Sequence, residues 1–284
     1  MLSSGGSGDR RRAAERGRAV ADIEGLVRTQ DGGVLTIRLN RPERLNAITW
    51  EMVKGITRYV AEAGPDPSVR VVVITGTGRA FSSGDDIVNG MGDWPGPYDR
   101  NDLHPDRGAH FDLVKTLLST PKPVIAALNG LTHGAGWVTA LSSDFRVARS
   151  DIVIGDIRAG KAIFANQGVG LLLPALIGKS RAMDLLMTGR VISAVEAERY
   201  GIINRLWSPE TYEAELAAFV GELAQGPTKN YAAWKASVNR DVLKDFEEYN
   251  DHERWLNLLL VNSEDRTEGV QAFREKRPPK FTGR

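Results

Sequence analysis

Two short glycine-containing segments hold residue types that could do chemistry. The first is "SSGDD", residues 82–86, and the second is "HGAG", residues 133–136, which is expected to begin a helix. Small residues at a helix start leave backbone N–H groups free, and the positive end of the helix dipole favours an anion. The next residues, Trp137, Val138 and Thr139, supply no acid, base or nucleophile. The segment therefore predicts a cradle for an anion or a developing oxyanion.

Each glycine segment follows a predicted buried strand. The runs "RVVVITG" at 70–76 and "PVIAALNG" at 123–130 are continuously apolar, which is typical of strands buried on both faces. A helix is expected after each turn, the first of them through Phe111 and Leu118. The order of strand, glycine turn and helix thus occurs twice, and it predicts a repeated ββα or βαβ unit whose two turns face one cleft.

Other segments complete a mixed α/β pattern. Residues 34–40 alternate as a half-buried strand does, and a helix is expected to begin near Thr49 as its N-cap. The remaining expectations are strands in "FRVA" and "DIVIGD", helices over 168–200, and helices over 209–276. Residues 88–107 combine Gly, Pro and charge without a period and predict a long irregular loop. We expect a disordered tail at 1–22, an α/β core at 23–207 and a C-terminal helical region at 208–284, serving as a cap or for trimerisation.

The composition excludes several classes of function. The chain has 284 residues with 37 basic and 36 acidic side chains, so no field of one sign favours nucleic acid or a membrane surface as a partner. The absence of cysteine excludes disulfides, thiolate metal sites and cysteine nucleophiles. The four histidines show no paired metal-ligand spacing, and no metal is expected. The sequence has no run of about 18 apolar residues that would predict a membrane span, so a cytoplasmic location is expected.

Longer segments resemble one known family. They are "LNRPERLNA" (39–47), "VVVITGTGRAFSSGDDI" (71–87), "KPVIAALNGLTHGAG" (122–136), "LIGKSRAMDLLMTGRVISAVEAERYGIINRL" (176–206) and "FREKRPPKF" (273–281). Together, and in this order, they resemble the enoyl-CoA hydratase/isomerase, or crotonase, superfamily. The resemblance implies a spiral of ββα repeats, a homotrimer or dimer of trimers, and an acyl-CoA substrate. Coenzyme A is expected only as part of that thioester, with no permanently bound cofactor.

The resemblance also implies roles for the two glycine segments. The backbone N–H groups of Asp85 and Ala135 match the family's oxyanion hole, which stabilises an enolate or a tetrahedral intermediate. The residues that match the family's CoA-binding positions are Arg44, Leu45, Ser83, Gly84, Asp86, Phe273 and Lys276. For Arg44 and Lys276, the alternative is an ordinary solvated surface charge.

The chain departs from the family where hydration would need acids. Hydratases of this family hold two glutamates, at positions that match Val138 and Arg158 here. Without a carboxylate there, no group remains to deprotonate water and protonate Cα, so simple hydration is not expected. Acid positions used by other members match Arg158, Asn166 and Ala165, again without a carboxylate.

The polar residues that remain near the expected site each have two interpretations. Asp156 could be a base tuned by Arg158 or only the salt-bridge partner of that arginine, and Arg158 could instead bind a second carbonyl or carboxylate of the substrate. Asn166 and Gln167 could orient a water or cap the helix that follows. His133 could be a base or a packed structural histidine. No role is assigned to other residues in or near the 88–107 loop: His104, His110, Asp93 and Asp102. Trp94 and Trp137 could wall an acyl pocket or be ordinary loop and core anchors.

Three classes of function stay open on these residues. The first is an enzyme that acts on an acyl-CoA thioester by hydrolysis, C–C cleavage, decarboxylation or double-bond isomerisation, all of which share an oxyanion or enolate intermediate. The second is a non-catalytic acyl-CoA-binding protein. The third is a serine hydrolase built from Ser82 or Ser83 with His133, although no GxSxG segment is present.

Overall fold

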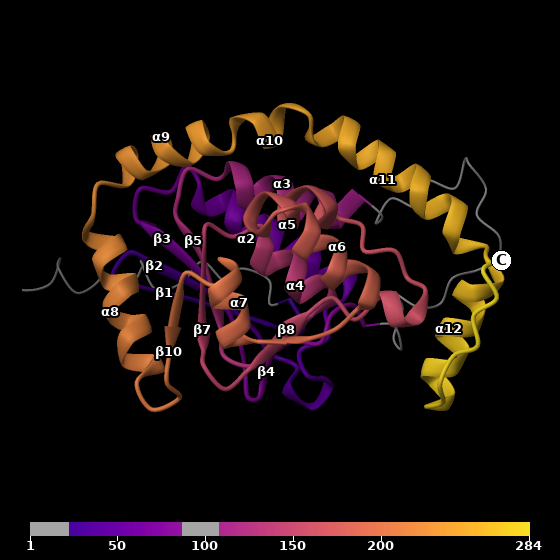
Figure 1. Ribbon diagram of the computed structural model, residues 1–284. Coiled ribbons are helices and arrows are strands. Elements are labelled where there is room, and N and C mark those ends of the chain that lie inside the picture. Colours follow the sequence, from indigo (N-terminus) through magenta and orange to yellow (C-terminus); the bar gives the residue numbers. More distant parts are fainter. Residues whose placement is uncertain (1–22, 87–107) are drawn as a thin grey trace, which may run out of the picture.

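The computed structural model describes residues 23–86 and 108–284 (Figure 1). The tail expected at 1–22 and the loop expected at 88–107 lie outside the described residues. In the described part, two β-sheets are flanked by helices. The helices of residues 228–275, called the arm below, arch over one side of this core.

The strands form a six-stranded and a four-stranded sheet. In the larger sheet the spatial order is β1-β2-β3-β5-β7-β10, and only the β1–β2 pair is antiparallel. In the smaller sheet the order is β4-β6-β8-β9, with β9 antiparallel to β8. The strands are β1 (Leu26–Asp31), β2 (Val34–Leu39), β3 (Val71–Gly76), β4 (Ala80–Ser82), β5 (Val124–Leu128), β6 (Leu131–His133), β7 (Phe145–Arg149), β8 (Val153–Gly155), β9 (Ile192–Ser193) and β10 (Arg205–Trp207).

The helices lie between and after these strands. They are the 3-10 turns η1 (Pro42–Arg44) and η3 (Ala159–Lys161), and α2 (Trp50–Ala63), α3 (Ala109–Ser119), α4 (Gly134–Leu141), α5 (Val169–Ile177), α6 (Lys179–Thr188), α7 (Ala194–Tyr200), α8 (Tyr212–Gln225), α9 (Thr228–Val238), α10 (Arg240–Lys244), α11 (Phe246–Val261) and α12 (Glu264–Glu275). The Thr49 side chain accepts a hydrogen bond from the Met52 N–H, which confirms the predicted N-cap of α2.

A ββα unit occurs three times, as β3-β4-α3, β5-β6-α4 and β7-β8-α5. In each unit the first strand joins the larger sheet, the second joins the smaller sheet, and a helix follows. Because equivalent strands of successive units pair in parallel, the turns that end β4 and β6 become neighbours. The predicted spiral of ββα repeats is confirmed.

The larger sheet is buried on both faces. Side chains of Val72 and Ile74 belong to the main core, beneath the helices of the repeats, whereas Val71 and Val73 pack on the opposite face. That second face is covered by α8, with Val220 among its buried residues. Two-sided burial explains why the β3 sequence is an unbroken apolar run and not an alternating one.

Polar contacts attach the C-terminal arm to the core. The Arg70 guanidinium donates to the Gly226 carbonyl (2.6 Å) ahead of α9. On α9, Lys235 forms a buried ion pair with Asp144 (2.7 Å). Further along, the Phe246 ring packs edge-on against Phe111 of α3. The arm, which arches over the core in Figure 1, therefore contacts the core at several points along its length.

Five strands were not predicted: β1, β4, β6, β9 and β10. Four of them have only two or three residues, which is too short to produce a recognisable alternation. β1 has six residues, but its polar, largely exposed composition gives no apolar period, and its place is determined by pairing with β2. Of the smaller sheet, only β8 was therefore visible in the sequence pattern, as "DIVIGD".

We predict that Asn46→Ala lowers the free energy of unfolding by about 1–3 kcal/mol. The fully buried Asn46 amide accepts from the Arg41 N–H (2.9 Å) and donates to the Thr77 and Ala80 carbonyls (2.9 and 2.7 Å), and alanine leaves these groups without that partner. Denaturant unfolding followed by circular dichroism measures the change.

The matched control is Asn40→Ala. Asn40 also contacts Thr77, but on the surface, so we expect a change within about 0.5 kcal/mol. Equal losses for the two variants would contradict the assigned role of the buried amide.

Candidate functional site

The two glycine turns meet backbone to backbone. A Cβ added to Gly84 would lie 3.2 Å from the Gly134 Cα and 3.5 Å from the Ala135 nitrogen. A Cβ added to Gly134 would lie 3.0 Å from the Gly84 Cα and 3.8 Å from the Asp85 nitrogen. Both glycines have positive φ, +103° and +52°, so glycine is required for conformation as well as for space. The backbone nitrogens of Asp85 and Ala135 thus lie on either side of one narrow contact.

The helix start behind this contact leaves donors unpaired. Ala135 is the second residue of α4, where an N–H has no partner within the helix. For residues 23–86 and 108–284, no hydrogen bond from the Asp85 or Ala135 N–H to another residue is observed. Two backbone donors beside a glycine contact could hold one oxygen atom of a ligand.

The first turn is attached to the loop after β2. The Ile48 N–H donates to the Gly84 carbonyl (2.8 Å), and the Asp86 N–H donates back to Ile48 (2.9 Å). The Ser83 N–H donates to the Leu45 carbonyl (2.9 Å), and the Asp86 carboxylate pairs with Arg41 (2.8 Å).

These contacts bring five of the predicted CoA-binding residues together along one edge of the site. The five are Arg44, Leu45, Ser83, Gly84 and Asp86.

Phe273 and Lys276 lie apart from that edge, at the end of α12. This helix packs on η3, and the Lys161 ammonium lies 4.1 Å from the Phe273 ring centroid. No hydrogen bond or ion pair in the described ranges joins Phe273 or Lys276 to the 44–48 loop. Their contact with CoA stays a prediction.

The position of the first hydratase glutamate is apolar and closed. Val138 lies in the first turn of α4 and is 1% exposed, and every residue of this helix is buried. Gly136 packs closely against Ser82: a Cβ added to Gly136 would lie only 2.6 Å from the Ser82 Cβ. No water-activating acid stands at this position.

At the second hydratase position, Arg158 forms a buried ion pair. Its Nε and Nη2 donate to the two oxygens of Asp156 (2.8 and 2.5 Å), and both residues are nearly fully buried. Although burial alone would raise it, the pKa of Asp156 lies below its usual value because the Arg158 guanidinium stabilises the carboxylate. The geometry is that of the salt-bridge interpretation, and a catalytic role for Asp156 or Arg158 stays a prediction.

A second acid lies at the contact itself. The Asp85 carboxylate oxygen Oδ1 is 2.9 Å from Nε2 of His110 in α3, and the two side chains are 22% and 4% exposed. Burial opposes ionisation of Asp85, but His110 and, more weakly, Arg158 hold its pKa below the usual value. The His110 ring packs against Trp50, with centroids 5.4 Å apart.

No role was predicted for His110 from the sequence. Its burial could have been predicted, because His110, Val114 and Leu117 are spaced as one face of a helix, and this is the buried face of α3.

The structure has the packed geometry for His133 and contradicts the capping interpretation of the loop before α5, while the catalytic interpretations of both stay predictions. The His133 ring is buried, its Nδ1 lies 3.1 Å from the Gly155 carbonyl oxygen, and burial lowers its pKa. The capping interpretation of Asn166 and Gln167 is wrong: the N-cap of α5 is Gly168, with no side-chain cap. The Gly168 N–H instead donates to the buried Glu253 carboxylate of α11 (2.7 Å), a residue that the sequence analysis did not identify.

The serine-hydrolase arrangement is not formed. The Ser82 hydroxyl accepts from the Gly84 N–H (3.1 Å), and the Ser83 hydroxyl lies near the Arg44 carbonyl (3.4 Å). Neither serine contacts His133 through a hydrogen bond in the part of the chain that the structure describes. In the same part, no group of three His, Asp or Glu side chains is arranged to hold a metal ion.

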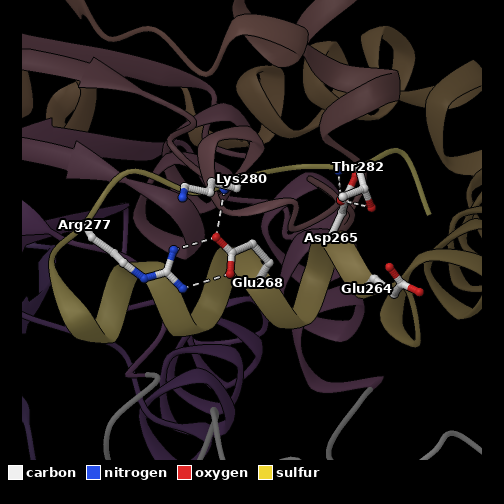
Figure 2. Close-up of a pocket in the computed structure, with 6 residues that line it drawn as sticks. All are labelled: Glu264, Asp265, Glu268, Arg277, Lys280 and Thr282. Carbon is white, nitrogen blue, oxygen red and sulfur yellow. Dashed lines mark hydrogen bonds and ion pairs between the residues drawn. The ribbon is translucent and has the colours of Figure 1, made fainter.

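A separate pocket of about 420 Å³ lies along α12 (Figure 2). Its carboxylates are occupied by the chain's own C-terminal segment: Glu268 accepts from Arg277 (2.6 Å) and from the Lys280 N–H (2.7 Å). Asp265 accepts from the Thr282 N–H (2.6 Å). These contacts fasten the last residues to the helix and leave no free acid for catalysis there.

Comparison with known proteins identifies the family of this chain. The family model described as enoyl-CoA hydratase/isomerase matches residues 29–284. The chain belongs to the enoyl-CoA hydratase/isomerase family. It is 33% identical to the 1,2-epoxyphenylacetyl-CoA isomerase of Escherichia coli K12, covering 92% of this chain and all of that one. It is 31% identical to the trans-2-decenoyl-[acyl-carrier-protein] isomerase of Streptococcus mutans, covering 93% and 100%.

The solved structures of the family have the same fold. An enoyl-CoA hydratase from Mycobacterium avium subsp. paratuberculosis superimposes with a TM-score of 0.82, at 28% identity, over 92% of this chain and all of that one. Relatives thus include proteins named as isomerases and as hydratases, and family membership alone does not select the reaction. No helix in the described ranges is long and apolar enough to span a bilayer.

We predict that Asp156→Asn lowers the free energy of unfolding by about 3–5 kcal/mol, because it leaves the buried Arg158 charge uncompensated. Asp151→Asn is the matched control: Asp151 also binds an arginine two residues away through both oxygens, but on the surface (3.0 and 2.6 Å). The control is expected to change stability by about 0–1 kcal/mol. Denaturant unfolding at pH 7 measures both, and a small loss for Asp156→Asn would contradict the structural role of the pair.

Proposed function

We propose that this protein is an acyl-CoA isomerase that moves a double bond by proton transfer through a thioester enolate. The observation that carries the proposal is the contact between Gly84 and Gly134, which brings the backbone nitrogens of Asp85 and Ala135 to one place. The thioester oxygen would accept from both N–H groups. Their donation would strengthen as the carbonyl becomes an enolate, so they would stabilise the transition state more than the substrate.

The side chains around this contact favour isomerisation over hydration. Hydration needs a positioned water and a carboxylate that activates it. Val138 closes one of the hydratase positions, and at the other Arg158 is neutralised by Asp156. Isomerisation needs a donor pair for the oxyanion and one group that carries a proton between two carbons, without water.

The CoA portion would bind along the edge formed by the 44–48 loop and the first glycine turn. Arg44 is exposed there and could pair with a phosphate, while Leu45 and Ser83 would border the pantetheine arm. Lys276 would supply a further cation. Coenzyme A is proposed only as part of the substrate and not as a resident cofactor.

A second candidate function is acyl-CoA binding without catalysis. It is favoured by the same two positions, since Val138 and the Asp156–Arg158 pair would leave the donor cradle intact but remove the family's acids.

We predict that the enzyme incubated with 2-enoyl- and 3-enoyl-CoA thioesters in D₂O interconverts them and incorporates deuterium at the carbon next to the carbonyl. Exchange follows from reversible enolate formation, and mass spectrometry of the thioesters measures it. Hydration of crotonyl-CoA is expected to be negligible. Micromolar binding with neither interconversion nor exchange across the panel would favour the non-catalytic binder, and a hydration turnover number within tenfold of an ordinary hydratase would refute the proposal.

Glycine variants provide the control for that experiment. Gly134→Ala should reduce exchange at least about 100-fold, the scale of losing one oxyanion donor, because the new methyl group would push the two turns apart. Gly32→Ala is matched in backbone conformation, with φ of +53° against +52°, but an added Cβ there meets no atom within 4 Å. It should leave the exchange rate unchanged.

We also propose that the chain assembles as a homotrimer or a dimer of trimers through the arm. The arm exposes apolar side chains in pairs one turn apart: Trp234 and Val238 on α9, and Trp255 and Leu259 on α11. Large exposed apolar surface of this kind is typical of an interface.

Light scattering should therefore give the mass of three or six chains of 31.0 kDa. The double variant Trp234→Glu with Trp255→Glu should lower that mass. Met187→Glu, which changes an exposed apolar residue of α6 outside the arm, should not. A monomer for the unaltered chain would contradict the assembly.

A further inference from the structure

We propose that the Asp85 side chain is the catalytic acid/base of this site and that His110 is its positioning residue. The inference rests on the proposed isomerase function and assigns the proton carrier that the function requires. Residue 85 would then act twice: its backbone N–H would hold the thioester oxygen, and its carboxylate would move the proton.

The first support is the position of the carboxylate. It lies close enough to its own backbone N–H for that group to favour the ionised form. A thioester oxygen bound to this N–H would bring the adjacent Cα within reach of the same carboxyl group, because only one carbon separates them. Oδ1 is buried against His110, while the side chain as a whole is 22% exposed. In the proposed role, the second oxygen would face the substrate.

The second support is the pairing with His110. Nε2 of His110 and Oδ1 of Asp85 are 2.9 Å apart, and neither atom has a hydrogen bond to any other described residue. Because an ionised carboxylate can only accept, Nε2 carries a hydrogen in this contact. Trp50 packs on the imidazole ring and fixes its orientation. Two polar groups so deeply buried are costly unless they serve each other or a ligand.

The charges around Asp85 suit a base that starts ionised. From α3, His110 favours the carboxylate, and from the loop after β8, Arg158 favours it more weakly. Asp156 opposes it, but that charge is largely balanced by its own bidentate contact with Arg158. The Asp85 carboxylate is thus favoured in its ionised form beside the two proposed oxyanion donors before reaction.

The proposed step keeps this charge constant. The Asp85 carboxylate takes a proton from Cα of a 3-enoyl thioester, the C–H bond breaks, and an O–H bond forms on Asp85. The electron pair moves into the enolate, whose oxygen is held by the Asp85 and Ala135 N–H groups. The neutral acid then returns the proton to the γ-carbon, which gives the 2-enoyl thioester. Negative charge moves from the carboxylate to the thioester oxygen and back, and no water or other reactant is consumed.

The other buried acids near the site each have a partner of their own, although Oε1 of Glu253 has no hydrogen bond in the described residues. Both oxygens of Asp156 bind Arg158. Glu253 accepts from the Gly168 N–H and is held by Tyr249, and its pKa is raised by burial. Asp86 pairs with Arg41. Asp85 is the acid that lies directly at the contact between the two turns.

The test is Asp85→Asn, which keeps the backbone N–H and the side-chain volume but removes the base. We expect kcat and deuterium exchange at Cα to fall about 10²- to 10⁴-fold, while affinity for the acyl-CoA, measured by calorimetry, changes little. Asp112→Asn, which removes an exposed acid from the same helix as His110, is the matched control and should retain full activity.

His110→Gln tests positioning. His110 lowers the pKa of Asp85, so without it that pKa should rise, and the acidic limb of the pH profile of kcat/KM should move to higher pH. A histidine that only packs would lower activity without moving this limb.

The outcomes separate this inference from the proposed function. If the unaltered enzyme exchanges Cα deuterium and Asp85→Asn retains the rate within threefold, the role of Asp85 is refuted and the isomerase function stands. If the unaltered enzyme neither interconverts the 2-enoyl and 3-enoyl thioesters nor exchanges Cα deuterium, both are refuted. Loss of exchange in a folded Asp85→Asn variant that still binds acyl-CoA supports the inference.

Discussion

The close approach of the Gly84 and Gly134 backbones is the constraint on which the rest of the site depends. Parallel pairing of Ser82 with Thr132 ends both strands at the same level, and the two turns then have no room for a side chain between them. Because the proposed donors, the N–H groups of Asp85 and Ala135, belong to the backbone, they are held by the sheet itself and would lose no side-chain entropy when a ligand binds. The ββα spiral can thus keep its donor pair while the surrounding side chains change.

The charges at the two positions that differ from the hydratases, Val138 and Arg158, are balanced within this chain. An arginine buried at the second glutamate position would be costly alone, and Asp156 compensates it two residues away. With that pair near neutral, the carboxylate of Asp85 can remain ionised beside the donors, supported by His110. An additional acid at Val138 would place two like charges around one small site and would raise the pKa of at least one of them.

The sequence predicted the parts of the fold that have a clear apolar pattern, either an unbroken run or a helical period. The strands near 71–76 and 124–128, the Thr49 cap and the helical arm are strongly patterned, and the structure has them. Most of the smaller sheet was not predicted, because β4 and β6 have three residues each and β9 has two, and these strands exist through pairing with their neighbours.

The same limit applies to the site. Residues on the two glycine turns could be found from local sequence, but contacts between distant segments could not. His110 and Glu253 are polar residues on the buried faces of their helices, and their partners, Asp85 and Gly168, lie far away in the chain. The helical period shows that they are buried, and only the fold shows what they contact.

The contact of Glu253 with Gly168 also links the arm to the site. Gly168 is the left-handed N-cap of α5, and the preceding residue, Gln167, has a positive φ as well and lies 3.5 Å from Arg158. The Glu253 carboxylate of α11 therefore holds the end of the loop whose Gln167 contacts the buried Arg158. Burial raises the pKa of Glu253, so this anchor is formed at a cost that the surrounding packing of α11 must offset. The arm is thus part of the framework that holds the Arg158 loop in place.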